Sequence, residues 1–128
     1  MITALYASVL ASLMIWLSAQ VIKQRRSNKI AYADGDVEAL KIARSAHGNA
    51  SEYIPITLIL MALLEHNGIG LLWIHGLGSV FVIGRVMHAR AILSNTLPGR
   101  KTGMLMTFAT MALLIVLNLL YLPVDKLW

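Results

Sequence analysis

Charged residues divide this chain into long uncharged stretches. Residues 1–22, 66–84 and 102–124 contain no Asp, Glu, Lys or Arg, and the stretch 45–64 contains Glu52 as its one charge. An apolar run of about 20 residues is long enough to cross about 30 Å of hydrocarbon as a helix. The pattern therefore predicts an all-α membrane protein with four spanning helices, at residues 2–22, 45–64, 66–93 and 102–124.

Turn-forming residues separate these stretches. Asn67-Gly68 and Leu97-Pro98-Gly99 predict turns, and Pro123 predicts the end of the last helix. Asp34-Gly35-Asp36 predicts a turn and N-cap for a helix that runs from Val37 to Glu65, about 43 Å long at 1.5 Å per residue. The second helix should therefore extend beyond the bilayer at one end.

The composition supports a membrane protein. Apolar residues make up 58% of the 128 residues and charged residues only 13%, whereas soluble domains carry roughly 25% charged residues. A soluble fold of this size could not bury so much apolar surface, so we expect one membrane domain over residues 1–128. The chain has no cysteine, which excludes disulfides and a cysteine nucleophile. Any thiol chemistry must therefore come from a ligand.

The basic residues that give the chain its net charge of +5 lie mainly in the connections between the expected spans. Basic residues beside apolar runs are typical of membrane topology rather than of nucleic-acid binding, and no nucleic-acid partner is expected. The positive-inside rule predicts that both basic connections are cytoplasmic, so that both chain ends lie outside (N-out, C-out). The first connection holds Lys23, Arg25, Arg26, Lys29, Lys41 and Arg44; residues 85–101 hold Arg85, Arg90, Arg100 and Lys101; Lys126 is in the tail.

Ionisable residues inside the expected spans are informative, because an unpaired charge costs at least about 2.5 kcal/mol at mid-bilayer. Helical spacing puts Asn49, Glu52 and Tyr53 on one face of the second helix, and Arg85 and His88 on one face of the third. Opposite charges on neighbouring helices predict an ion pair between Glu52 and Arg85. Spacing alone leaves two interpretations open, a pair that fixes helix packing and a binding site.

Two cations precede the expected fourth helix. Arg100 and Lys101 come just before Thr102, where a helix N-terminus favours an anion. The same pair would also serve as a topology signal at the interface, and the two roles are compatible. His66 and His75 flank the short turn without a third ligand, so no metal site is expected.

The segment Ala46-His47-Gly48-Asn49-Ala50-Ser51-Glu52-Tyr53-Ile54-Pro55, with Gly84-Arg85-Val86-Met87-His88, resembles the membrane-associated proteins in eicosanoid and glutathione metabolism, the MAPEG family. The resemblance extends over nearly the whole chain and is greatest to a small bacterial branch. It implies a homotrimeric four-helix bundle in the inner membrane, with glutathione as cosubstrate in a cleft between subunits that opens toward the cytoplasm.

The resemblance also assigns roles to particular residues. Arg100, or else Lys101, occupies the place of the arginine that stabilises the glutathione thiolate, and Thr102 lies near a serine that some members use. Two positions depart from the family pattern: Ser45 replaces an arginine and Ile92 replaces an aromatic residue. The expected glutathione contacts are Arg26, Asn49, Glu52, Tyr53, Arg85 and His88.

The function implied by the resemblance is a membrane glutathione S-transferase, or a related peroxidase, with a role in detoxification. The thiolate would attack small hydrophobic molecules that enter from the lipid bilayer. One alternative is a membrane protein that binds glutathione or lipid without turnover. Another is a transporter of the small multidrug type, which also has four spans and one membrane glutamate, but in its first helix rather than its second.

Overall fold

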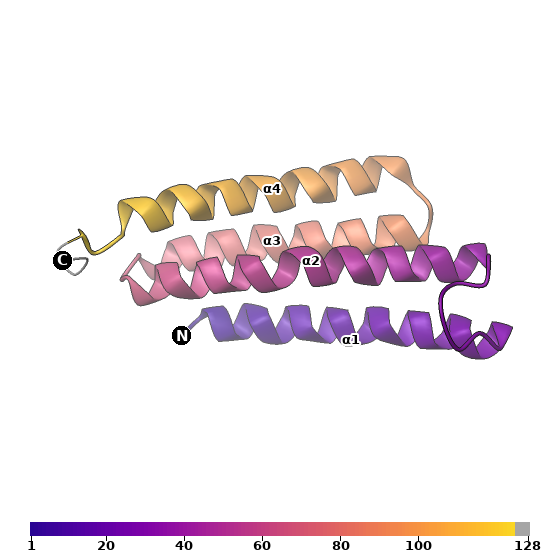
Figure 1. The fold of residues 1–128 in the computed structure, drawn as a ribbon. Helices are drawn as coiled ribbons and strands as arrows, with labels where there is room; N and C mark the ends of the chain where they lie inside the picture. Colours follow the sequence, from indigo (N-terminus) through magenta and orange to yellow (C-terminus); the bar gives the residue numbers. More distant parts are fainter. Residues whose placement is uncertain (125–128) are drawn as a thin grey trace.

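Four long helices run up and down in one bundle within residues 1–124, the part of the chain that this computed structural model describes (Figure 1). They are α1 (Thr3–Asn28), α2 (Glu38–His66), α3 (Leu71–Leu93) and α4 (Leu97–Leu120). Connections 29–37 and 94–96 lie at one end, here called the basic end, and the 67–70 connection lies at the other, the turn end (Figure 1). The all-α prediction is confirmed. Lys126 lies outside the described residues.

Three helices in the described part of the chain, α1, α3 and α4, are long and apolar enough to cross a membrane. α2 is also long, with 29 residues, and carries its charged residues mainly toward the basic end. It packs against each of the other three helices. The bundle is therefore that of a membrane protein, with a more polar helix lying among apolar ones.

Some helix boundaries differ from the prediction. α4 begins at Leu97, so Leu97-Pro98-Gly99 forms its first turn rather than a loop. Proline fits there because the first amides of a helix have no partner within the helix. The chain turns instead at residues 94–96, where Asn95 has a φ of 55°. α3 begins at Leu71 and not at residue 66, because Gly68, with a φ of 87°, opens a connection that precedes it.

The start of α2 also corrects the prediction. Val37, not Asp36, is the N-cap residue, and no side chain caps the helix. Asp36 has a left-handed φ of 59°, and its carboxylate accepts a hydrogen bond from Lys41 Nζ at 3.0 Å. This carboxylate therefore binds a side chain in α2 rather than the free amides of its first turn. The long second helix itself is confirmed.

α3 and α4 approach each other closely at two glycines. A Cβ built on Gly84 would lie 2.8 Å from Met106 Cβ. A Cβ on Gly103 would lie 2.7 Å from the carbonyl oxygen of Gly84 and 2.8 Å from the amide nitrogen of His88. Only glycine fits where two backbones meet at this distance. This close approach holds His88 against α4.

α1 is attached at the turn end by polar contacts with α2 and α3. The Glu65 carboxylate accepts hydrogen bonds from the amide and hydroxyl of Thr3, at 2.8 and 2.6 Å, and so places a negative charge at the N-terminus of α1. The Tyr6 hydroxyl lies 2.9 Å from His75 Nδ1, and the Tyr6 ring fills the space left by Gly78. Within residues 1–124, α1 has no contact with α4.

Candidate functional site

Arg85 is the fully buried charge of the bundle interior and joins three helices. From α3, its Nη2 donates to Asn49 Oδ1 on α2 at 2.7 Å, and its Nη1 donates to Thr107 Oγ1 on α4 at 3.4 Å. The guanidinium also lies over the ring of Tyr53, with Cζ 5.8 Å from the ring centroid. These contacts hold α2, α3 and α4 in one arrangement around a cation.

The predicted ion pair between Glu52 and Arg85 is wrong. Glu52 is exposed, and the salt bridges of the described residues are Lys41–Asp36 at 3.0 Å and Arg44–Asp34 at 3.5 Å. A step of three residues turns a side chain by about 60° around a helix, which is enough to send Asn49 toward α3 and Glu52 away from it. Arg85 is therefore surrounded by neutral dipoles and an aromatic ring, and no acid among residues 1–124 forms a salt bridge with it.

A groove of about 440 Å³ opens at the basic end between α2, α3 and α4. We call it the polar groove. Several of its residues belong to the predicted site, and Lys41, Ser45 and Asn49 also line a neighbouring hollow. The polar groove is lined by Glu38, Lys41, Ile42, Ser45, Asn49, His88, Ile92, Asn95 and Arg100.

Buried nitrogens without a hydrogen-bond partner lie at this groove or close to it. His88 is buried, and its Nδ1 has no partner. Arg100 is half-buried; its Nη2 donates to Asn95 Oδ1 at 3.0 Å, but its Nε has no partner. Arg85 Nε, one turn before His88 on α3, is also without one. Within residues 1–124 these three atoms are the buried side-chain nitrogens and oxygens that lack a hydrogen bond. Since each such group costs about 1–3 kcal/mol, their clustering indicates a binding site.

Other predicted site residues lie outside the polar groove. Arg26 is exposed in the last turn of α1, and Lys101 and Thr102 are exposed in the first turns of α4. The Thr102 hydroxyl donates to the carbonyl of Pro98 at 3.1 Å. Tyr53 packs edge to face on Phe108, with ring centroids 5.5 Å apart, beside Arg85. Their predicted contacts with glutathione stay predictions.

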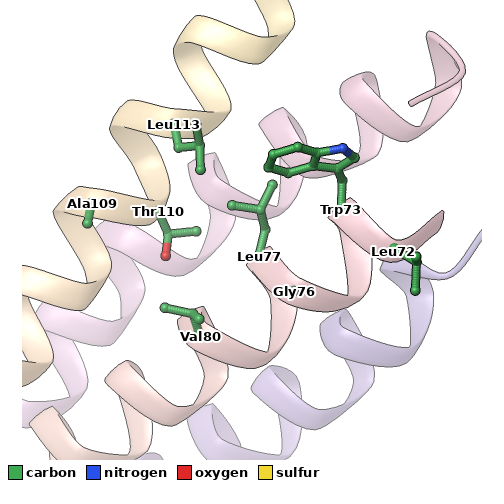
Figure 2. A pocket seen from close by; sticks show the side chains of 8 residues that line it. All are labelled: Leu72, Trp73, Gly76, Leu77, Val80, Ala109, Thr110 and Leu113. Atoms are coloured by element: carbon green, nitrogen blue, oxygen red, sulfur yellow. The ribbon is translucent and has the colours of Figure 1, made fainter. Parts of the chain in front are cut away.

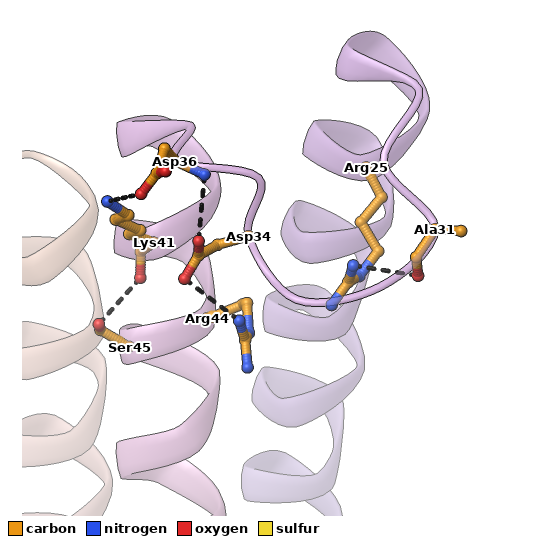
Figure 3. A network of polar contacts seen from close by, with 7 residues as sticks. All are labelled: Arg25, Ala31, Asp34, Asp36, Lys41, Arg44 and Ser45. Carbon is orange, nitrogen blue, oxygen red and sulfur yellow. Dashed lines mark hydrogen bonds and ion pairs between the residues drawn. The ribbon is translucent and has the colours of Figure 1, made fainter.

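Glu52 lines the neighbouring hollow rather than the polar groove. This hollow has a volume of about 610 Å³ and is formed by one side of α2 and the connection that precedes it. Figure 3 shows its charged rim, where Asp34 and Asp36 of the connection face Arg44 and Lys41 of α2. Asn49 lies between the two concavities, so Glu52 is near the site without facing Arg85.

Thr107 and Lys41 are among the residues of this region that the sequence did not single out as site residues. Thr107 accepts the hydrogen bond from Arg85 while its own hydroxyl donates to the carbonyl of Gly103 at 2.9 Å. The sequence signal that could have identified Thr107 is its polar side chain within an otherwise uncharged span. Lys41 was counted only as a topology charge, although it lies one and two turns before Ser45 and Asn49 on the same helix face.

A third hollow, of about 400 Å³, is apolar and lies between α3 and α4 toward the turn end (Figure 2). Its residues offer the Thr110 hydroxyl as their one polar side-chain group apart from the Trp73 indole. A ligand that carries carboxylates and an ammonium would lose its hydration there without replacement, so this hollow does not suit glutathione. It is lined by Leu72, Trp73, Gly76, Leu77, Val80, Ala109, Thr110 and Leu113.

The bundle and its buried cations define a polytopic helical membrane protein with a polar site at one end. The chain belongs to the MAPEG family, whose model matches residues 3–120. It is similar to the inner membrane protein YecN of Escherichia coli strain K12, with 37% identity over 123 residues that cover 96% of this chain and 94% of the relative. YecN of Escherichia coli O6:H1 strain CFT073 has the same identity and coverage. The protein is thus an integral inner membrane protein.

Proposed function

We propose that this protein is a membrane glutathione S-transferase, or a related glutathione-dependent peroxidase, that acts on small hydrophobic electrophiles. The observation that carries the proposal is the set of unpaired buried nitrogens on His88 and Arg100, which line the polar groove, and on Arg85, one turn before His88 on α3. The guanidinium nitrogens among them are hydrogen-bond donors. An anionic ligand with several acceptor atoms would satisfy such donors. Membership of a family named for glutathione metabolism supports glutathione as that ligand.

Glutathione has the chemistry that this groove can bind. It carries two carboxylates, one ammonium and one thiol. Guanidinium groups bind carboxylates through charge-assisted hydrogen bonds, and Glu38 in the groove or Glu52 beside it suits the ammonium. Asn49 supplies neutral hydrogen bonds and holds Arg85 in place. The groove thus offers both signs of charge, with cations in excess.

Arg100 is the residue that we assign to thiol activation. It lies in the first turn of α4, where the free amides of the helix add to the positive potential. A free thiol has a pKa near 8.5, so that only a few per cent is thiolate at neutral pH, and a nearby guanidinium and helix N-terminus lower that pKa. The protein then needs no nucleophile of its own, since the ligand supplies the sulfur.

The remaining features belong to the same proposal. We place the basic end in the cytoplasm, with both chain ends outside, and we propose a homotrimer in which neighbouring subunits close the groove. In this assembly Arg26, Lys101 and Thr102 reach the ligand from the rim. The hydrophobic cosubstrate enters from the lipid bilayer and meets the thiolate at the subunit boundary.

The test is conjugation of glutathione to a chloronitrobenzene by the purified protein in detergent or lipid. Arg100→Ala should lose most of the activity, whereas Arg90→Ala, which removes an exposed arginine from the end of α3 outside the groove, should retain it. Absence of conjugate from the wild type would exclude this transferase activity. Binding of glutathione with an unchanged thiol pKa would instead indicate a non-catalytic binding protein.

A further inference from the structure

The connection between α1 and α2 places two acidic residues against two cations at the edge of the site (Figure 3). Asp36 Oδ1 lies 3.0 Å from Lys41 Nζ, and Asp34 Oδ2 lies 3.5 Å from Arg44 Nη1. These are the ion pairs of residues 1–124, and both involve a cation that lines a concavity next to Asn49. The connection therefore neutralises basic residues at the place where an anion would bind.

Lys41 is the better placed of the two cations. It lines both the polar groove and the neighbouring hollow, and it shares a helix face with Ser45 and Asn49 at intervals of four residues. The ammonium of Lys41, like the guanidinium groups of Arg100 and Arg85, is stabilised by a nearby negative charge. In this structure Asp36 provides that charge from outside the groove.

We propose that Lys41 is a further ligand-binding residue of the polar groove, which recognises a carboxylate of the bound ligand, and that Asp36 occupies it while the groove is empty. This inference rests on the proposed glutathione site and adds a specificity residue and its internal competitor. The ligand carboxylate replaces the Asp36 carboxylate at Lys41 Nζ. No covalent bond changes.

The exchange needs only a side-chain movement. Asp36 is 97% exposed and Lys41 41% exposed, and a bridge between such exposed groups contributes little stability. The turn that carries Asp36 is held by its own bonds, since the Asp36 amide donates to Asp34 Oδ1 at 3.2 Å and the Val37 amide donates to the Asp34 carbonyl at 3.0 Å. The Asp36 carboxylate can therefore leave Lys41 while the backbone of the connection stays in place.

The same bridge keeps Lys41 ready for an anion. Its hydrogen bond with Asp36, and the nearby charge of that carboxylate, raise the pKa of the Lys41 ammonium. A ligand carboxylate at the same distance would act in the same direction. Lys41 thus stays charged whether Asp36 or the ligand is its partner.

Calorimetry of glutathione binding to the purified full-length protein tests the inference. Asp36→Asn removes the competitor and should lower Kd about two- to fivefold, the range expected for loss of an exposed ion pair. Lys41→Gln should raise Kd by a similar factor or more and weaken the salt dependence of binding. Lys23→Gln removes an exposed charge of the same kind from α1 and should change Kd less than Lys41→Gln does.

Asp34→Asn controls for the loss of an acidic charge. It removes the same charge from the same connection and frees Arg44, which does not line the polar groove, but it leaves the bridge between Lys41 and Asp36. Its effect should therefore be at most half that of Asp36→Asn. Equal effects of the two variants would mean that bulk charge acts and would overturn the inference. So would a wild-type Kd that neither Asp36→Asn nor Lys41→Gln alters, although the glutathione site would then stand. Absence of binding in every variant would remove both proposals, and binding by Asp36→Asn alone would support the competition.

Discussion

The hydrogen bond from Arg85 Nη2 to Asn49 Oδ1, at 2.7 Å, links α3 to α2 through a guanidinium that no solvent reaches. An amide oxygen orients this cation without neutralising it. The positive potential of Arg85 thus remains available at the polar groove, whose lining includes Asn49, its hydrogen-bond partner, and His88, one turn further along α3. A carboxylate in the same place would have fixed the helices equally well and cancelled that potential.

Substitution of Asn49 should separate the packing role of this bond from its role in binding. Asn49→Ala leaves a buried donor of Arg85 without its acceptor and should lower the free energy of unfolding by about 1–3 kcal/mol. Asn49→Asp supplies a carboxylate for Arg85 and should be the more stable of the two variants. It should also weaken glutathione binding about tenfold, because a negative charge then lines the groove.

Thermal unfolding in detergent and calorimetry measure these two effects separately. If Asn49→Asp binds glutathione as tightly as the wild type does, the positive potential of Arg85 is not used by the ligand.

The backbone contact between α3 and α4 should be intolerant of one added methyl group. Gly103→Ala would bring a Cβ to 2.7 Å from the carbonyl oxygen of Gly84 and 2.8 Å from the amide of His88, and neither backbone atom can rotate away. We expect a loss of about 1–3 kcal/mol in the free energy of unfolding. Gly76→Ala is the matched control, because its Cβ would meet nothing within 4 Å. Similar thermal midpoints for the two variants would contradict the close contact.

The thiol of bound glutathione should respond to Arg100 more than to Lys101. Arg100 lines the polar groove, whereas Lys101 is exposed beside it. Arg100→Ala should raise the pKa of the bound thiol by about one pH unit, which corresponds to about 1.4 kcal/mol. Ultraviolet absorbance of the thiolate during a pH titration measures this, and a larger effect of Lys101→Ala would reverse the assignment.

The attachment of α1 should depend on the negative charge of Glu65. Glu65→Gln keeps an acceptor but loses the charge at the helix N-terminus, and Glu65→Ala loses both. We expect losses of about 0.5–1 kcal/mol for the first variant and more for the second. Hydrogen exchange of the first amides of α1 gives the readout. Unchanged protection in Glu65→Ala would show that other contacts hold this helix.

The helices were predictable because membrane spans leave a simple record, the absence of charge over about 20 residues. The ends of the helices were harder to predict. Pro98 predicts a turn by its usual preference, but the first turn of a helix accepts proline equally well, and sequence alone does not distinguish the two. Aspartate is a common N-cap residue. Asp36 nevertheless has a positive φ that excludes it from that role, and this φ depends on the whole 29–37 connection.

For the site, helical spacing correctly grouped Arg85 with His88, which are both buried, and it put Asn49 and Glu52 on one face of α2. In the structure Asn49 meets Arg85, whereas Glu52 is exposed. Helical spacing did not reveal how far α2 is rotated about its axis, and that rotation decides whether Asn49 or Glu52 meets Arg85. The contact of Thr107 with Arg85 was not predicted for a related reason. A threonine in an apolar span usually forms its hydrogen bond within its own helix. Thr107 does so at the carbonyl of Gly103, and it also accepts from Arg85.

The meeting of Gly84 and Gly103 has a consequence for how a ligand enters. Two helices in backbone contact, joined by residues 94–96, form a stiff hairpin that carries His88 and Arg100 as one piece. A ligand that enters the polar groove therefore meets His88 and Arg100 at a fixed separation. The wall of the groove that α3 and α4 form thus keeps one shape whether or not a ligand is bound.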